Sequence, residues 1–166
     1  MNEGLVEMFR YNAWANHRLF ESCRSLTDEQ LDSHVPGVSG SVRELLMHIV
    51  GGQQTFILRT KGLQHQGELN RGSVWPGIDK LIEMAENTSH ELIAIAGQIG
   101  DQDQVDLPYL GKTYRYPKRF LLVHAMEHSV EHRTEVKVAL GHLGVETPDL
   151  DGWPYSAAVG YGQVVQ

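Results

Sequence analysis

The chain has a single cysteine, Cys23, among its 166 residues. An internal disulfide is therefore excluded, and so is a zinc site built from several thiolates. Any metal ion that the protein binds must be held by histidine, by carboxylates or by water. Cys23 lies near the end of a predicted helix, and the sequence indicates no base that would activate its thiol. This argues against a role as a nucleophile.

Long apolar runs and clusters of positive charge are also missing. No segment approaches the roughly 20 apolar residues that a transmembrane helix needs. Residues 1–4 lack the basic and apolar regions of a signal peptide. We therefore expect a cytoplasmic protein without a membrane partner. The formal net charge is −7 and the pI is near 5.7, with no basic run, so we expect no nucleic-acid partner.

Four segments carry apolar residues at the spacing of three and four that is typical of amphipathic helices. They are residues 4–24, 41–60, 78–99 and 117–142. Thr27 to Gln30 and Ser41 to Glu44 are capping-box patterns, and the second of them opens the second long helix. Residues 101–116 suggest a short β-hairpin with a turn around Gly111-Lys112, although Pro108 weakens it. We predict that residues 145–166 are irregular.

These elements predict a single all-α domain over residues 1–166. The predicted fold is an up-down four-helix bundle, with a long connection after the second helix and a small β-hairpin before the fourth. Residues 62–77 form the long connection, which could cover a pocket with residues such as Trp75.

Three of the nine histidines, His124, His128 and His132, lie four residues apart in the last predicted helix. Residues at this spacing differ by about 40° around a helix, so the three rings form one stripe. Val136 and Ala139 continue the same face, which indicates that the stripe points inward. Arg133 points away from it. A buried ring needs a polar partner, and neighbouring imidazoles on one helix are a common way to hold a metal ion.

A metal ion needs a third ligand from another helix, and His48 is the best candidate. Gly52, one turn later, would let a ligand or a second helix approach closely. The alternative is that these histidines are hydrogen-bonded core residues. Asn12 and Asn16 interrupt the apolar face of the first helix. They either bond across the core or line a pocket at the site.

Two glutamates, Glu131 and Glu135, lie close to the histidine face. Either carboxylate could accept the second N–H of a ligating imidazole and fix its tautomer. Each could equally be a solvated surface residue. The sequence identifies no general acid or base.

Several segments together resemble one known family over nearly the whole chain. They are Tyr11-Asn12-Ala13-Trp14-Ala15-Asn16, Ser41 through His48-Ile49, the spaced histidines that end in His132-Arg133, Leu143-Gly144-Val145, and Pro148 through Asp151. The first pattern is loose and the histidine spacing is specific. The chain resembles the DinB-like (DinB/YfiT) superfamily of metal-dependent enzymes.

The resemblance implies a four-helix bundle, a homodimer, and a divalent metal ion, nickel or zinc, bound by three histidines. The matching residues are His48, His128 and His132, which makes His124 a neighbour of the site. Thr134 departs from the glycine that many members carry after the His-Arg pair, and it does not touch the ligands. Characterised members include transferases and isomerases that use low-molecular-weight thiols.

The sequence thus predicts a divalent-metal-binding protein, with a small-molecule substrate if it is an enzyme. The reaction class is transfer to or from a small thiol, or hydrolysis. The alternative is a non-catalytic bundle whose metal ion staples the helices or serves as a sensor. A di-iron carboxylate bundle fits poorly, because it needs Glu-x-x-His on two helices and Glu44 lies four residues before His48.

Overall fold

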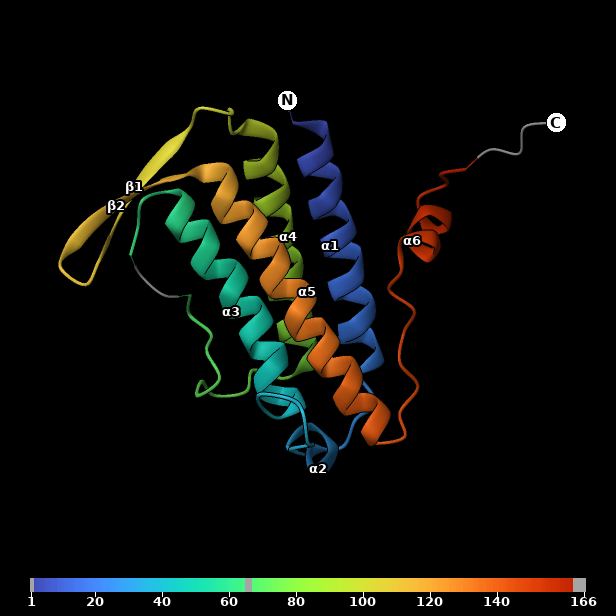
Figure 1. The fold of residues 1–166 in the computed structure, drawn as a ribbon. Helices are drawn as coiled ribbons and strands as arrows, with labels where there is room; N and C mark the ends of the chain where they lie inside the picture. The colour runs from blue at the N-terminus through green and yellow to red at the C-terminus, as the bar shows by residue number, and fades with distance from the viewer. Residues whose placement is uncertain (1, 65–66, 163–166) are drawn as a thin grey trace.

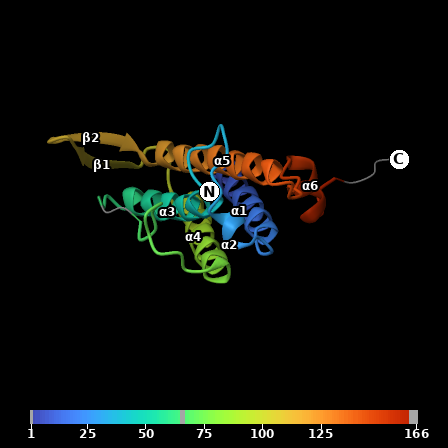
Figure 2. The same ribbon diagram turned by 90° about the horizontal axis from the view of Figure 1, so that it is seen from below.

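Four long helices build the body of the protein (Figures 1 and 2). The computed structural model describes residues 2–64 and 67–162. The long helices are α1 (Glu3–Ser22), α3 (Val42–Thr60), α4 (Ile78–Gln98) and α5 (Lys118–His142), with short α2 (Asp28–Leu31) and α6 (Gly152–Ala158). A hairpin of β1 (Gln104–Tyr109) and β2 (Lys112–Pro117) precedes α5. Within the described ranges, no helix is long and apolar enough to span a membrane.

Both predicted capping boxes are confirmed. The Ser41 hydroxyl accepts a bond from the Glu44 backbone N–H at 3.3 Å, and the Glu44 carboxylate accepts one from the Ser41 N–H at 2.8 Å. Thr27 and Gln30 make the same reciprocal pair at the start of α2. These bonds satisfy N–H groups that would otherwise lack a helical partner. They fix the start of α3, the helix that carries His48.

The connection between α3 and α4 runs back along α3. A Cβ atom on Gly51, in the middle of α3, would lie only 1.9 Å from the Leu69 carbonyl oxygen. Farther along, the Trp75 ring centroid lies 5.0 Å from the guanidinium carbon of Arg43, in the first turn of α3. The chain therefore returns to the starting end of α3, and α3 and α4 run in the same direction (Figure 1). The predicted four-helix bundle with its long connection is confirmed. A strict up-down order would make α3 and α4 antiparallel, whereas the long connection makes them parallel.

Two apolar clusters fill the bundle on either side of a polar middle layer. One cluster centres on Leu45, Leu81 and Leu140, and the other on Phe56 and Leu122. The layer between them holds buried polar residues from all four long helices: Asn12, Asn16, Gln53, Thr88, Ser89, Ser129 and Arg133. Polar groups in a core must be hydrogen-bonded, so this layer fixes how the four helices align.

Arg133 occupies the centre of the polar layer and is only 3% exposed. Its Nη1 donates to the amide oxygen of Asn16 at 2.8 Å and to that of Asn12. Burial lowers the pKa of Arg133 to about 10, so the guanidinium still carries its charge at neutral pH. The expectation that Asn12 and Asn16 bond across the core is confirmed. Arg133 points away from the histidines, but toward α1 and not toward solvent.

The segment after α5 corrects one prediction. Residues 152–158 form α6, whereas the sequence predicts irregular structure from residue 145 onward; residues 163–166 lie outside the described residues. Seven residues that include Gly152 and Pro154 are too short to show a helical period. The Asp151 carboxylate caps this helix by accepting from the Trp153 N–H at 3.0 Å. Tyr155 anchors it, because its hydroxyl donates to Glu7 of α1 at 2.5 Å.

The hairpin is confirmed, with Val105 opposite Tyr116 and Pro108 opposite Thr113. It turns through Leu110 and Gly111, which have positive φ angles of 48° and 74°. Two such residues are typical of the tight turns that join twisted antiparallel strands. The hairpin projects from the end of the bundle where α5 begins (Figures 1 and 2).

The polar layer yields a stability prediction. Replacing Arg133 by methionine leaves two buried amide oxygens without a donor, which should lower the free energy of unfolding by about 3 kcal/mol. Replacing Asn12 and Asn16 by leucine in the same chain should restore most of this loss, because an apolar layer needs no partners. Urea denaturation gives the free energy of unfolding of both variants. An Arg133→Met protein as stable as the wild type would contradict the described role of Arg133.

Candidate metal centre

Three histidines converge where α3 faces α5. His48 comes from α3, and His128 and His132 come from successive turns of α5. Each offers one ring nitrogen, and these three atoms all lie within 4.8 Å of one another. The Nε2 atoms of His48 and His128 are 3.2 Å apart. The His132 ring centroid lies 4.4 Å from that of each of the other two.

The spacing of these nitrogens suits a shared ion. Zinc–imidazole bonds of about 2.0–2.1 Å at tetrahedral angles place two ligand nitrogens roughly 3.3 Å apart. The 3.2 Å between His48 and His128 is close to that value. Three imidazoles that converge in this way can hold a divalent ion and leave further coordination positions for other ligands.

Gly52 makes the close approach of α5 to α3 possible. A Cβ atom at this position would lie 2.4 Å from Cε1 of the His128 ring and 2.8 Å from its Nδ1. Any side chain there would push the ring out of line with His48. The prediction that Gly52 admits a ligand or a helix is confirmed.

Glu135 orients His132 from behind the cluster. Its Oε2 lies 2.6 Å from Nδ1 of His132. The same carboxylate accepts bonds from the Ser39 backbone N–H at 2.9 Å and the Ser39 hydroxyl at 3.0 Å. A carboxylate only accepts, so Nδ1 of His132 carries the proton and Nε2 presents its lone pair to the cluster.

The surroundings of Glu135 favour its ionised form. Burial alone would raise the pKa of this carboxyl, but hydrogen bonds from His132 and Ser39 outweigh burial and lower it. Arg71 extends the chain of contacts, because its guanidinium donates to the Ser39 hydroxyl at 2.8 Å and also to the Ser39 carbonyl. The long connection after α3 therefore reaches the site through Arg71.

The two facing imidazoles are held neutral. Burial, followed by the nearby His132 and Arg71, lowers the pKa of His48 to about 4. Burial, together with the neighbouring histidines, lowers the pKa of His128 to about 3. A neutral imidazole is the form that binds a metal ion. At neutral pH, protons therefore do not compete for these two rings.

The structure separates the candidates that the sequence leaves open. His124 is exposed and lies beside Phe56, with ring centroids 4.8 Å apart, so the inward stripe covers only His128 and His132. Glu131 is exposed, and Glu135 is the carboxylate that contacts a ring. Trp75 packs on Arg43, and no contact places it beside the histidines.

Sequence reasoning misses two residues of the site, Ser39 and Arg71. Ser39 lies in a Gly-rich break and Arg71 in a polar loop, and neither position has a periodic pattern. Only Ser41, two residues after Ser39, gives a local signal, because its capping box fixes where α3 begins.

A protein-family comparison now places the chain. The DinB family model matches residues 1–159, which is nearly the whole sequence. The chain belongs to the DinB family. Its histidine cluster could hold a metal ion. A comparison with curated proteins finds no match to this DinB protein.

Two solved structures share the fold of this DinB protein. A DinB-like protein from Bacillus cereus ATCC 10987 is 20% identical, with a TM-score of 0.68 over 90% of this chain and 99% of the other. A DinB-like protein (YjoA) from Bacillus subtilis is 21% identical, with a TM-score of 0.64 over 89% and 98% of the two chains. These likenesses support the helical fold.

The lowered pKa values predict how the metal-free protein responds to acid. In an unfolded chain, His48 and His128 titrate near pH 6.5, whereas in the folded protein they do so near 4 and 3. The unfolded chain binds more protons below pH 6.5, so the free energy of unfolding should fall as the pH drops from 6.5 toward 4.

Urea midpoints across this range, measured with a chelator present, test the prediction. The His48→Gln/His128→Gln variant should show a shallower pH dependence. His90→Gln, at an exposed position on α4, is the matched control and should leave the slope unchanged. Equal slopes in all three proteins would show that the two rings are not held neutral by folding.

Proposed function

We propose that this protein binds one divalent metal ion through His48, His128 and His132 and uses it as a metal-dependent enzyme. The observation that carries the proposal is the convergence of three imidazoles on one point, with Glu135 orienting His132. Three protein ligands and open positions are typical of catalytic sites, whereas structural sites are closed by four. Zinc and nickel are the proposed ions, since both accept imidazole ligands.

The proposed reaction is transfer to or from a low-molecular-weight thiol, or hydrolysis of a small electrophilic molecule. A divalent ion held by His48, His128 and His132 would supply a Lewis acid that favours the deprotonated form of a bound thiol or water. Glu135 keeps the Nδ1 proton of His132 in place, so that the ring faces the site with Nε2. The thiol co-substrate and a homodimeric assembly rest on the family resemblance.

Metal binding gives the first test. Wild-type protein, purified without an affinity tag, should contain about one zinc or nickel ion per chain by elemental analysis. His128→Ala and His132→Ala should each abolish stoichiometric binding while helix content by circular dichroism stays unchanged. His124→Ala is the matched control, one turn away on the same helix, and should keep the ion. An equal loss of metal in His124→Ala would show that the ligands lie one helical turn away from the proposed set.

The binding of an added ligand to the metal ion then distinguishes a catalytic site from a purely structural one. After cobalt is substituted for the native ion, added cysteine should produce a thiolate-to-cobalt charge-transfer absorption, and serine should not. An open coordination position is required for this change. An unchanged spectrum, together with loss of helix content when the ion is chelated, would indicate a metal staple and contradict the enzyme proposal.

A further inference from the structure

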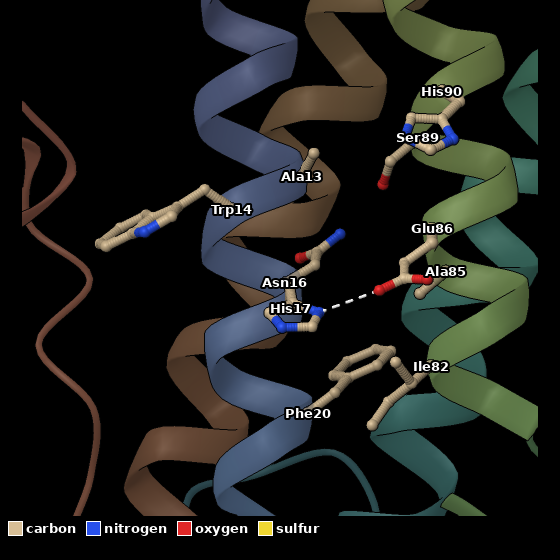
Figure 3. Close-up of a pocket in the computed structure, with 10 residues that line it drawn as sticks. All are labelled: Ala13, Trp14, Asn16, His17, Phe20, Ile82, Ala85, Glu86, Ser89 and His90. Atoms are coloured by element: carbon tan, nitrogen blue, oxygen red, sulfur yellow. Dashed lines mark ion pairs between the residues drawn. The ribbon is translucent and has the colours of Figure 1, made fainter. Parts of the chain in front are cut away.

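A recess of about 390 Å³ lies between α1 and α4. The histidine cluster comes from α3 and α5, and none of its three residues lines this recess. Figure 3 shows the recess with side chains from both helices around it. Its volume falls within the range of about 300–1,000 Å³ that is typical of small-molecule sites.

Asn16 lies at the base of the recess with an unused hydrogen-bond donor. The side chain is 1% exposed, and its Nδ2 has no partner among the described residues. Its amide oxygen accepts from Arg133 at 2.8 Å. Arginine only donates, so this bond fixes which end of the amide is oxygen. The Nδ2 group is thereby turned toward α4 (Figure 3).

The Asn16 N–H donor costs free energy while it is unpaired. Its surroundings also make it a stronger donor. A buried N–H without an acceptor has lost its bond to water and gained nothing in return. The Arg133 guanidinium, bonded to the oxygen of the same amide, draws electron density from the nitrogen and makes its N–H a better donor. An acceptor atom that reaches the base of the recess would satisfy it.

Ser89 adds a second donor from the opposite helix. It is 4% exposed and lines the same recess. Its Oγ accepts a long bond of 3.5 Å from Gln53, and its hydroxyl donates to no acceptor within the described part of the chain. Asn16 on α1 and Ser89 on α4 thus present an N–H and an O–H to the same recess from opposite helices.

The remaining walls define the rest of the ligand. Phe20, Ile82 and Ala85 give the recess an apolar lining. At its mouth, the half-exposed His17 and Glu86 lie 3.2 Å apart and bridge the two helices. The Glu86 carboxylate disfavours an anionic ligand, and the net charge of −7 acts in the same direction.

We propose that the recess between α1 and α4 is a second binding site, which takes a small, neutral, mostly apolar molecule through one carbonyl-type oxygen. The oxygen accepts from Asn16 Nδ2 and from the Ser89 hydroxyl, and the apolar part of the molecule lies against Phe20, Ile82 and Ala85. The site is independent of the metal centre and of the reaction proposed there.

The test uses the full-length protein as purified and three probes of similar shape, and binding is followed by two-dimensional ¹H–¹⁵N NMR. Acetophenone carries the acceptor, α-methylstyrene replaces its C=O by C=CH₂, and benzoate adds a negative charge. Acetophenone should shift signals from α1 and α4 in a saturable way, including the Asn16 side-chain amide. Benzoate should bind more weakly than acetophenone. The difference in affinity between these two probes should be smaller in the Glu86→Gln variant.

Asn16→Asp keeps an acceptor for Arg133 and puts a carboxylate oxygen in place of the N–H donor. Acetophenone should bind it at least about fivefold more weakly, because one hydrogen bond is lost and the new oxygen repels the carbonyl oxygen. α-Methylstyrene, which has no oxygen, should lose much less affinity. Ser89→Ala, which leaves Arg133 untouched, should weaken acetophenone in the same way. Equal acetophenone affinity in the wild type and both variants, or no saturable shift on α1 and α4, would overturn the proposal.

Discussion

The contact between α3 and α5 at Gly52 is the constraint on which the candidate metal centre depends. Gly52 has no side chain, and a Cβ atom there would meet the His128 ring at 2.4 Å. His48 lies one turn before Gly52 on α3, and His132 lies one turn after His128 on α5. Close contact at this point therefore brings three imidazoles together from two rigid helices. A site held by helices keeps its geometry better than one held by loops.

Helix α5 contributes side chains both to the histidine cluster and to the polar middle layer. His132 and Arg133 are neighbours in the chain, and neighbours on a helix point about 100° apart. His132 faces α3 and Glu135, whereas Arg133 faces the amides of Asn12 and Asn16 on α1. Burying a cation is costly unless its donors are used. The oxygens of the two asparagines offset part of that cost without a carboxylate. Among the described residues, Asn16 Nδ2 and Arg133 Nη2 remain without a hydrogen-bond partner.

Local signals made most of the fold predictable. The capping boxes at Thr27 and Ser41, the apolar periodicity and the hairpin turn at Gly111 each depend on residues close in sequence. The convergence of His48 with His128 and His132 was also expected, because histidines four apart on one helix already share a face. The caps, the periodicity, the hairpin turn and the shared face of His128 and His132 are properties of single segments. The addition of His48 from a second helix followed from the predicted bundle and from the resemblance to the DinB family.

The features that sequence reasoning missed depend on contacts between distant segments. Arg133 looks like a surface residue until Asn12 and Asn16, more than a hundred positions away, supply its acceptors. Glu131 and Glu135 cannot be separated until Ser39 is placed beside one of them. α6 is held by Tyr155 against α1 and not by any period of its own. In each case, tertiary packing decides between local alternatives that are nearly equal.

X-ray absorption spectroscopy of the zinc-loaded and nickel-loaded protein tests the central claim most directly. The account predicts three imidazole nitrogens at about 2.0–2.1 Å from zinc, together with at least one oxygen ligand from solvent. That result would establish a three-histidine centre with an open position. A spectrum with no imidazole scattering, or a first shell filled entirely by protein ligands, would contradict it.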